Sequence, residues 1–465
     1  MSAGRRVVVV GGGLAGIAAA LDCAAAGAQV TLVEVRPRLG GAAYSFERDG
    51  MQIDNGQHVF MRCCGAYRAL LARLGSEGGV LLQRRLRVPV LTPGGTAAEL
   101  GRRSLPAPLH MLGSLLRYRH LPLAERMRAV RAAIALTRLD PRDDELDRLA
   151  FADWLEARGQ GAEAVEVLWD VIVRPTLNAP ASGASLALGA FVFRTALLSK
   201  ADAGDIGFHA RALSETIGKP AERALAEAGV EVLLGWRAEA LERVDSGIAV
   251  RAGSEELDGD AAILAVPHAR AASMLSELLP DTARKLAALE SSPIVNLHVV
   301  YDRVVCEEPF AAAVRTPVQY LIDRTAAGGV PAGCQYLAVS LSGADEEMSM
   351  SADALRERYL PALRELLPRA REARVERFLV TREHAATFRA APGTAALRPS
   401  ARTAVPGLVL AGAWTDTGWP ATLEGAVLSG HAAAAAALDQ LRLERAPLDP
   451  AVATGAHAMR PPARA

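Results

Sequence analysis

Three glycines and one carboxylate near the start of the chain have the spacing that binds a dinucleotide. Gly11 permits a tight turn, Gly13 lets the backbone approach a pyrophosphate, and Gly16 allows a helix to pack closely on a strand. Glu34, about 20 residues further on, can accept hydrogen bonds from ribose hydroxyls. The residues predicted to contact the cofactor here are Gly11, Gly13, Leu14, Ala15, Gly16 and Glu34.

The elements around these residues agree with that role. Residues 7–10 are four consecutive valines, the pattern of a buried parallel strand. Residues 14–26 are predicted to form a helix that Gly27 ends, and residues 29–33 a second strand. A strand, a glycine turn, a helix and a strand ending in an acid together predict a Rossmann-like dinucleotide-binding unit.

A second basic turn with paired glycines follows the second strand and can wrap the same phosphates. It resembles the extended FAD signature of the flavin amine oxidase and phytoene desaturase superfamily, which implies FAD rather than NAD as the cofactor. That superfamily commonly has Arg or Lys after the paired glycines, where this chain has alanine. The residues predicted to contact the cofactor here are Arg36, Arg38, Gly40, Gly41 and Ala42.

The carboxy-terminal part carries the other half of the signature. Residues 407–412 have the pattern of a short buried strand that runs into a glycine turn, and a helix is predicted to begin near Thr422. The N-terminus of that helix favours an electron-rich group such as the pyrimidine end of a flavin. The segment resembles the superfamily's last flavin-binding motif, and a structural plug formed by Trp419 and Pro420 is the alternative. Where Ala413 stands the superfamily usually has an acid, which predicts weaker cofactor affinity. The residues predicted to contact the cofactor here are Gly412, Ala413, Pro420, Ala421 and Thr422.

The flavin domain is predicted to be discontinuous. Residues 230–234 and 260–267 are strand-like, and the turn after the first of them adds Ala238 as a predicted cofactor contact. The predicted fold class is therefore α/β, a Rossmann-like FAD-binding domain of the amine-oxidase type with an inserted α+β substrate-binding domain. The FAD-binding domain is assigned residues 1–65, 205–275 and 395–440, the substrate-binding domain residues 66–204 and 276–394, and a loosely ordered tail residues 446–465.

Within the substrate-binding domain, hydrophobic periodicity predicts the main elements. Helices are expected at residues 121–137, 151–173 and 352–367, and strands at residues 293–301 and 336–342.

Composition and charge indicate which kinds of partner the protein is expected to bind. Lys+Arg 52 equals Asp+Glu 52, so the overall charge gives no reason to expect a nucleic acid partner. Five scattered cysteines without C-x-x-C spacing indicate neither a disulfide framework nor a zinc site, and we expect no metal. A reducing cytoplasmic location is predicted, and any membrane contact is expected to be peripheral, on the inner face of the cytoplasmic membrane.

Four further segments resemble a narrower family, the squalene-associated FAD-dependent desaturases, over residues 6 to 440. They are residues 54–67, 151–155, 168–178 and 418–422. The resemblance implies hydroxysqualene dehydroxylation in bacterial squalene and hopanoid synthesis, in which an allylic hydroxyl is replaced by a hydride from reduced flavin. The implied substrate is a long-chain isoprenoid in an apolar tunnel. The alternative is a desaturase or oxidase acting on a carotenoid-like isoprenoid or an amine, and a flavin-bearing isoprenoid carrier is a further one.

Four polar residues are candidates for assisting hydroxyl departure, because hydroxide is a poor leaving group. His58 and Arg62 follow the second glycine turn, and Arg174 and Asn178 are polar residues within an otherwise apolar motif. Three of them have a structural alternative: a backbone hydrogen bond for His58, an ion pair for Arg174 and a turn cap for Asn178. No second nucleotide motif is present, so the sequence leaves the electron donor open between NAD(P)H, another reduced flavin and a protein.

Residues 102–138 combine seven or more arginines with Leu, Met and Tyr. A basic amphipathic helix can lie on an anionic membrane surface. The alternative is a solvated helix face packed on its own domain.

Overall fold

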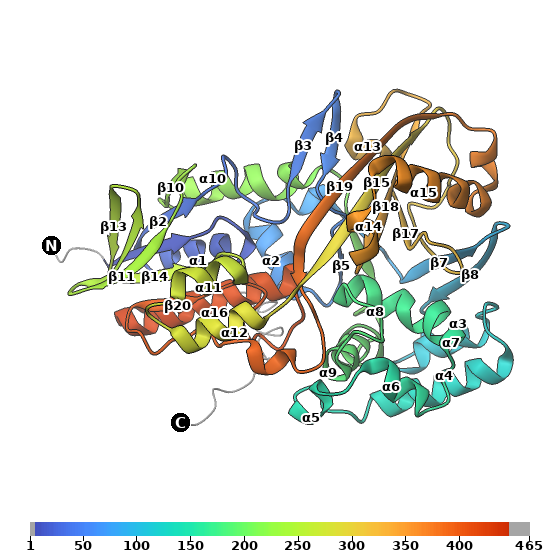
Figure 1. Ribbon diagram of the computed structural model, residues 1–465, viewed down its shortest axis with the longest axis horizontal. Coiled ribbons are helices and arrows are strands. Elements are labelled where there is room, and N and C mark those ends of the chain that lie inside the picture. Colours follow the sequence, from blue (N-terminus) through green and yellow to red (C-terminus); the bar gives the residue numbers. More distant parts are fainter. Residues whose placement is uncertain (1–4, 446–465) are drawn as a thin grey trace.

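The computed structural model describes residues 5–445, so the predicted tail lies outside the described residues. A parallel sheet has the strand order β10-β2-β1-β14-β20 (Figure 1). Its strands are β1 (Arg6–Val10), β2 (Gln29–Glu34), β10 (Glu231–Leu234), β14 (Ala261–Leu264) and β20 (Leu408–Leu410). All five come from the segments assigned to the FAD-binding domain, and the domain boundaries themselves stay a prediction.

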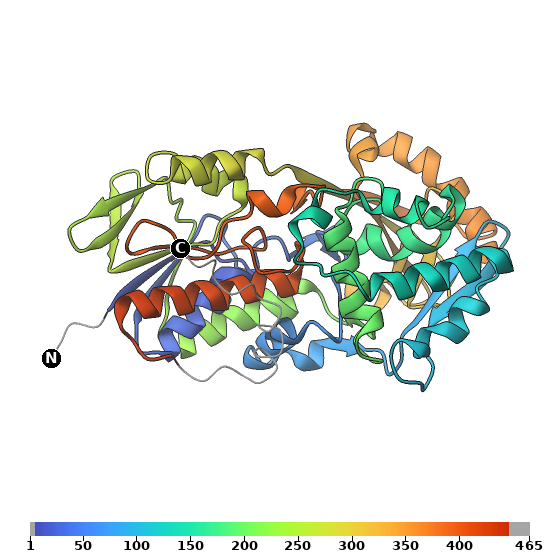
Figure 2. The same cartoon turned by 90° about the horizontal axis from the view of Figure 1, so that it is seen from below.

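The valine run of β1 is buried on both faces, as expected of a central parallel strand. Val7 and Val9 pack into one hydrophobic cluster with the helices, while Val8 and Val10 pack into another on the opposite face. Figure 2 shows the helices together on one side of the sheet. They are α1 (Leu14–Ala25), α10 (Lys219–Glu227) and α16 (Leu423–Leu441), and the antiparallel strands on the other face are β11 (Ala240–Val244), β12 (Gly247–Ala252) and β13 (Glu255–Gly259).

A second sheet of seven strands has the order β19-β15-β18-β17-β16-β7-β8. Helix α15 (Ala352–Leu366) covers one face, where Tyr359 and Leu363 pack on Val295 and Val339 in one cluster. The strands are β7 (Arg87–Thr92), β8 (Thr96–Gly101), β15 (Ser291–Tyr301), β16 (Phe310–Ala313), β17 (Tyr320–Asp323), β18 (Gln335–Ser342) and β19 (Val375–Phe388).

Short helices form the lower right part of the molecule in Figure 1. The predicted helix at 121–137 is α4 (Leu123–Leu136). The segment 151–173 is broken instead of continuous, because Gly159 adopts φ +72° and ends the first helix. The helices here are α3 (Leu112–Leu116), α5 (Asp144–Asp147), α6 (Phe151–Glu156), α7 (Ala162–Ala164), α8 (Asp170–Leu177) and α9 (Leu186–Val192).

Smaller elements connect the two sheets. A salt bridge of 2.6 Å between the buried side chains of Asp54 and Arg324 joins β4 to the second sheet. Of the helices that the structure describes, none has both the length and the apolar character to cross a bilayer. The remaining elements are β3 (Ser45–Arg48), β4 (Met51–Asp54), β5 (Val59–Met61), α2 (Gly65–Arg73), β6 (Val80–Leu82), β9 (Ile206–His209), α11 (His268–Leu275), α12 (Pro280–Ala288), α13 (Thr325–Gly328) and α14 (Asp345–Ser349).

Candidate active site

The carboxyl ends of the parallel strands gather the predicted cofactor residues at one edge of the sheet. Gly11 follows β1, Glu34 ends β2 and Gly412 follows β20. Gly11 adopts φ +113°, and a Cβ there would lie 2.4 Å from the carbonyl oxygen of Ala265 after β14. Only glycine fits this turn, so its backbone position is fixed by the packing of neighbouring strands.

Glu34 is buried and already organises the backbone of this edge. Its Oε2 accepts a hydrogen bond of 2.7 Å from the N–H of Gly12, and its Oε1 accepts one of 2.8 Å from the N–H of Arg36. Each carboxylate oxygen keeps a second acceptor site. The residue can therefore hold the turn and still accept hydrogen bonds from ribose hydroxyls.

The two glycine turns lie against each other. The N–H of Gly40 donates to the carbonyl of Gly12 at 2.9 Å, and a Cβ on Gly41 would lie 2.7 Å from the Cα of Gly13. Gly13 is the N-cap of α1, and no side chain caps the helix there. The N–H groups of the first turn, from Leu14, Ala15 and Gly16, thus remain suited to an anion.

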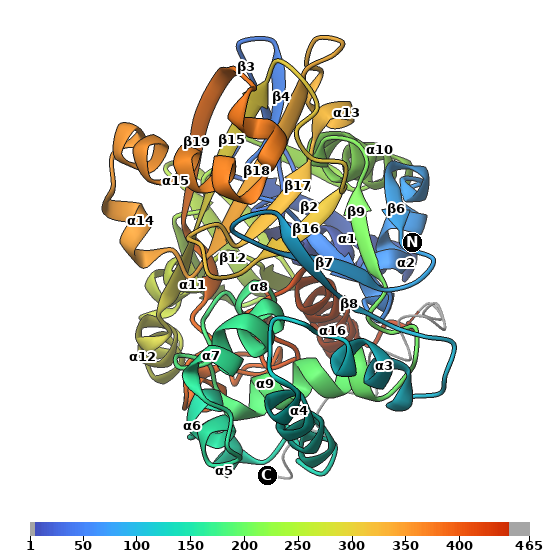
Figure 3. The ribbon, with the colours of Figure 1, turned by 90° about the vertical axis from the view of Figure 1, so that its right-hand side faces the viewer.

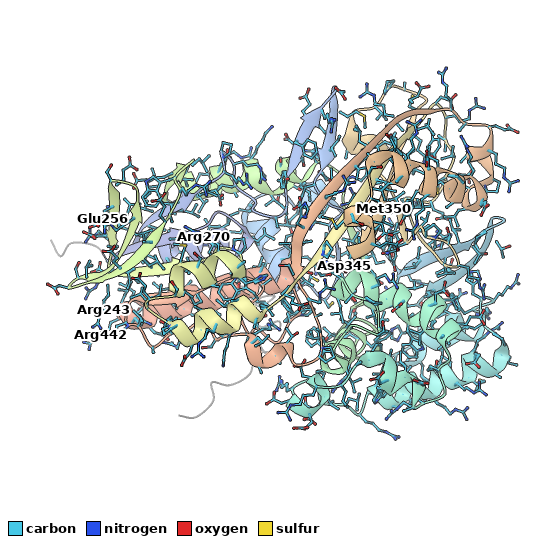
Figure 4. The ribbon with its side chains drawn as sticks, in the orientation of Figure 1. Arg243, Glu256, Arg270, Asp345, Met350 and Arg442 are labelled. Carbon is cyan, nitrogen blue, oxygen red and sulfur yellow. The ribbon has the colours of Figure 1, made fainter. Side chains whose placement is uncertain are left out.

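The basic residues of the second turn lie in different surroundings. Arg36 is exposed, whereas the guanidinium of Arg38 stacks 3.5 Å from the ring centroid of Tyr44 and donates to the carbonyl of Gly41. Ala238 is buried, and its carbonyl accepts a hydrogen bond of 2.8 Å from Arg270. Arg270 is labelled in Figure 4.

The carboxy-terminal turn depends on a buried arginine that the sequence did not indicate. Arg398 donates from Nη2 to the carbonyls of Thr415 at 2.6 Å and Trp419 at 2.8 Å, and makes longer contacts with those of Ala413 and Trp414. Burial lowers the pKa of Arg398 to about 10, so it stays protonated at neutral pH. One cation therefore shapes the loop that precedes Pro420 and Ala421.

Helix α16 begins directly after this loop. Thr422 is its N-cap, and its Oγ1 accepts a hydrogen bond of 3.1 Å from the N–H of Gly425. Glu424, which has no exposed surface, accepts hydrogen bonds from the N–H groups of Ala66 at 3.0 Å and Tyr67 at 2.7 Å in the first turn of α2. One carboxylate thus fixes the start of α16 against the start of α2.

The buried carboxyl group of Glu424 makes stability depend on pH. Burial raises its pKa from 4.5 to about 7, so the folded protein binds a proton more tightly there than the unfolded chain does. Stability from this group is present below pH 4.5 and is lost as pH rises through about 7. Relative to E424Q, the wild type should lose about 2 kcal/mol of unfolding free energy between pH 5 and pH 8. Urea denaturation at both pH values measures this difference, and parallel pH curves for the two proteins would contradict it.

Asn55 holds the second glycine turn against the next loop. Its Nδ2 donates to the carbonyl of Ala42 and to Oε1 of Glu383, both at 2.9 Å, and its Oδ1 accepts from the N–H of Tyr44 at 3.1 Å. Its own carbonyl accepts hydrogen bonds from Asn296 at 3.3 Å and Thr381 at 3.1 Å. The loop that carries His58 is therefore fixed to the second glycine turn and to strands β15 and β19 of the second sheet.

The side chains of His58 and Asn296 meet at this loop. A Cβ on Gly56 would lie 3.7 Å from Nε2 of His58 and 3.8 Å from Nδ2 of Asn296. Burial lowers the pKa of His58, while the charge of Asp54 and a hydrogen bond with the backbone of Ala42 partly oppose that shift, so the structural alternative for His58 has support as well. Gln57 Nε2 and Asn296 Oδ1 are buried and have no hydrogen-bond partner among the described residues. No sequence motif marks Asn296, which lies on β15, far away along the chain.

The other three candidates have structural contacts. Arg62 forms two hydrogen bonds with the buried Asp205, which also binds Arg102. Arg174 forms a 3.1 Å ion pair with Asp170 one helical turn away. Both arginines thus have ion-pair partners, as the structural alternative for Arg174 predicts.

Asn178 is buried at the end of α8 with φ +52°, and its side chain is satisfied on three sides. Its Nδ2 donates to Ser292 O and Thr387 Oγ1, both at 3.0 Å, and its Oδ1 accepts from the N–H of Gly343 at 2.7 Å. Asn178 thus joins α8 to β15 and β19. A catalytic role for Arg62, Arg174 or Asn178 stays a prediction.

The residues present fit a flavin nucleotide. The uncapped first turn of α1 suits a pyrophosphate, and Gly13 leaves its approach open, because a Cβ there would meet only the Cα of Gly41 at 3.8 Å. Near the start of α16 the buried Nε1 of Trp419 has no hydrogen-bond partner in the described part of the chain. An indole N–H in that position can donate to a carbonyl oxygen or ring nitrogen of a flavin.

Comparison with known proteins also indicates a flavin-binding protein. Residues 14–438 match the flavin-containing amine oxidoreductases, and the chain belongs to that family. It is a flavin-dependent oxidoreductase. An oxidoreductase from Methanosarcina mazei has a similar fold, with a TM-score of 0.72 and 18% identity over 92% of this chain and 99% of that one.

Two groups of isoprenoid enzymes are similar to it over their whole length. The hydroxysqualene dehydroxylase of Sinorhizobium fredii is 28% identical over 94% of this chain and 99% of its own. The probable zeta-carotene desaturase of Synechococcus elongatus is 26% identical over 93% of this chain and 98% of its own. The resemblance to hydroxysqualene dehydroxylases is confirmed, and these identities do not separate the two reactions.

Proposed function

We propose that the chain is an FAD-dependent hydroxysqualene dehydroxylase, which replaces an allylic hydroxyl group by hydrogen and releases squalene. In this reaction a C–O bond breaks, a C–H bond forms, and the hydroxyl leaves as water after gaining one proton. When bound and reduced, FAD supplies the hydride and is oxidised by two electrons. A carotenoid-like substrate, from which hydride is removed instead, is the second candidate because of the similarity to the zeta-carotene desaturase.

The polar cluster at Gly56 carries this proposal. Gln57 Nε2 and Asn296 Oδ1 are a buried donor and a buried acceptor without partners among the described residues. Leaving such groups unpaired costs about 1–3 kcal/mol each. An alcohol has a proton to donate to Asn296 Oδ1, whereas a carotene hydrocarbon has none. The cluster therefore supports an oxygen-bearing substrate.

His58 is the residue that we propose acts on the hydroxyl group. Burial lowers its pKa, so most of the imidazole is neutral at neutral pH, and the minor imidazolium form can give the hydroxyl oxygen the proton with which it leaves as water. Long apolar stretches of substrate are expected to lie in an apolar tunnel of the substrate-binding domain. We also propose that the protein meets its substrate at the inner face of the cytoplasmic membrane.

Substituting His58 should slow the reaction without removing the flavin. We expect His58→Phe to lower the rate of squalene formation about a hundredfold, and His58→Gln, which keeps a donor, to restore part of it. The wild-type rate should rise as pH falls from neutral toward the lowered pKa of His58, because more of the imidazole is then protonated, and this rise should be absent in His58→Gln. His384→Phe, at an exposed position on β19, is the matched control. Equal rates in His58→Phe and the wild type would contradict the assignment.

The reaction itself is tested by isotope transfer. The purified protein is reduced without oxygen in D2O and given hydroxysqualene, and the products are analysed by mass spectrometry. Because the transferable hydrogen of a reduced flavin exchanges with solvent, the expected product is squalene with one added deuterium. Squalene without added deuterium, or hydride removal from a carotene as the only reaction, would contradict the proposal.

A further inference from the structure

Helix α4 has apolar side chains on two opposite faces. Its inner face is buried against the protein through Ala129, Ala132 and Leu136. On the outer face Leu123, Met127 and Ile134 are 63%, 46% and 48% exposed. These three lie at positions i, i+4 and i+11, which share one side of a helix. No segment within residues 5–445 covers this outer stripe.

The segment before α4 exposes three more large apolar residues, which are Leu105, Leu109 and Leu116. It lies beside α4, because Arg126 of α4 donates to the carbonyl of Leu116 at 2.7 Å. Helix α4 and helix α3 in this preceding segment lie at the end of the molecule remote from the parallel sheet, as Figures 1 and 3 show. We call the outer stripe of α4 together with Leu105, Leu109 and Leu116 the apolar patch.

Cations surround the apolar patch. Residues 102–138 contain eight arginines and one acidic residue, Glu125. A cavity of about 170 Å³ between β8 and α3 is lined by Arg103, Arg117 and Arg119, and the first two approach each other over Gly113. None of the three forms a salt bridge within residues 5–445. Such a cavity suits the phosphate of an anionic lipid.

The acidic residue of this cavity does not neutralise it. Glu99 also lines the cavity, but its Oε2 accepts a hydrogen bond of 2.9 Å from Arg87 on the neighbouring strand. Ser114 Oγ, the neutral polar group there, donates to the carbonyl of Glu99 and accepts from Gly101. The guanidinium groups therefore set the sign of the local charge.

We propose that α3 and α4 form a docking surface for an anionic bilayer, with the apolar patch entering the interface and Arg103, Arg117 and Arg119 binding lipid phosphates. Apolar insertion next to several arginines is the combination that holds a helix in a membrane interface. A second copy of the chain suits the surface poorly, because a symmetric contact would bring the same arginines together. This docking does not depend on which isoprenoid the enzyme converts.

The test measures how the full-length flavoprotein partitions onto vesicles, with no turnover involved. Vesicles of phosphatidylcholine alone are compared with vesicles of equal parts phosphatidylcholine and phosphatidylglycerol, at low and high salt. We expect binding to the anionic vesicles that weakens with salt. L123Q/M127Q/I134Q and R117Q/R119Q should each lower the partition coefficient about tenfold.

Two control variants carry the same kinds of change elsewhere. L81Q/L149Q/V304Q alters three other exposed apolar side chains, and R243Q/R442Q alters two arginines at the opposite end of the molecule (Figure 4). Both should bind vesicles as the wild type does, and flavin content should be the same in all five proteins. Wild-type binding that is absent, equal on neutral vesicles, or equally weakened in the controls would overturn the proposal. So would concentration-dependent dimerisation that L123Q/M127Q/I134Q abolishes in sedimentation experiments.

Discussion

Gly13→Asp is expected to give a folded protein that has lost its flavin. Gly13 is the N-cap of α1, has extended backbone angles and meets no protein atom nearer than 3.8 Å from a built Cβ. Aspartate is a better N-cap than glycine and should stabilise the helix by roughly a few tenths of a kcal/mol. Its carboxylate would occupy the N–H groups of the first turn and repel the pyrophosphate, so flavin affinity should fall about a hundredfold or more.

Gly13→Asp is expected to raise helix stability while it lowers flavin affinity, so a loss of flavin cannot be attributed to unfolding. Flavin fluorescence titration gives the affinity, and circular dichroism of the flavin-free protein gives the unfolding midpoint. Gly13→Ala, which adds volume without charge, should lose much less affinity. If Gly13→Asp retains flavin with wild-type affinity, the pyrophosphate does not bind at this helix.

The second large effect is expected at Arg398. Arg398→Met keeps the length and apolar part of the side chain but leaves the carbonyls of Thr415 and Trp419 without their donor. We expect a loss of about 3 kcal/mol in unfolding free energy, because these hydrogen bonds involve a buried charge. The loop before α16 should also lose its shape, so flavin affinity should fall with stability.

Arg402→Met is the matched control. Arg402 lies four residues further along the same segment, is half exposed, and pairs with Asp439 at the surface. Exposed pairs contribute about 0–1 kcal/mol, so this variant should resemble the wild type in both urea denaturation and flavin titration. Equal behaviour of the two variants would show that Arg398 has no special role in the loop.

The flavin-binding half of the fold was predictable because its signals are local. Four valines, a glycine turn and an acid lie within thirty or so residues, and each element forms where its own sequence places it. The structure brings Gly13 and Gly41 into contact, as two turns wrapping one phosphate group require. That the predicted residues contact FAD remains a proposal.

Much of the second sheet was not predictable in the same way. Strand β19 is 14 residues long, but as an edge strand it is mostly half exposed, so no hydrophobic alternation marks it. Pro89 within β7 argues against a strand, and β7 is nevertheless paired on both sides. Both β19 and β7 form because they pair with strands distant in the sequence, and a single sequence does not reveal such pairing.

The candidate site shows the same limit at the level of single residues. His58 was identified from its place after a glycine turn, but Asn296 reaches the same point from a strand more than two hundred residues away. Glu424 and Arg398 were missed because a buried charge looks like a surface charge in a sequence. Only the fold shows that Glu424 caps a different helix from its own.

A dehydroxylase must pass electrons from reduced flavin to hydroxysqualene, whereas a desaturase passes them from its substrate to oxidised flavin. The flavoprotein, fully reduced and free of oxygen, is mixed with hydroxysqualene while flavin absorbance is followed by stopped flow. If the enzyme is a hydroxysqualene dehydroxylase, we expect the absorbance of oxidised flavin to return in a single turnover, with one squalene formed per flavin. If hydroxysqualene leaves the reduced flavin unchanged, while a carotene reduces the oxidised flavoprotein, the enzyme is a desaturase and the proposed dehydroxylation is wrong.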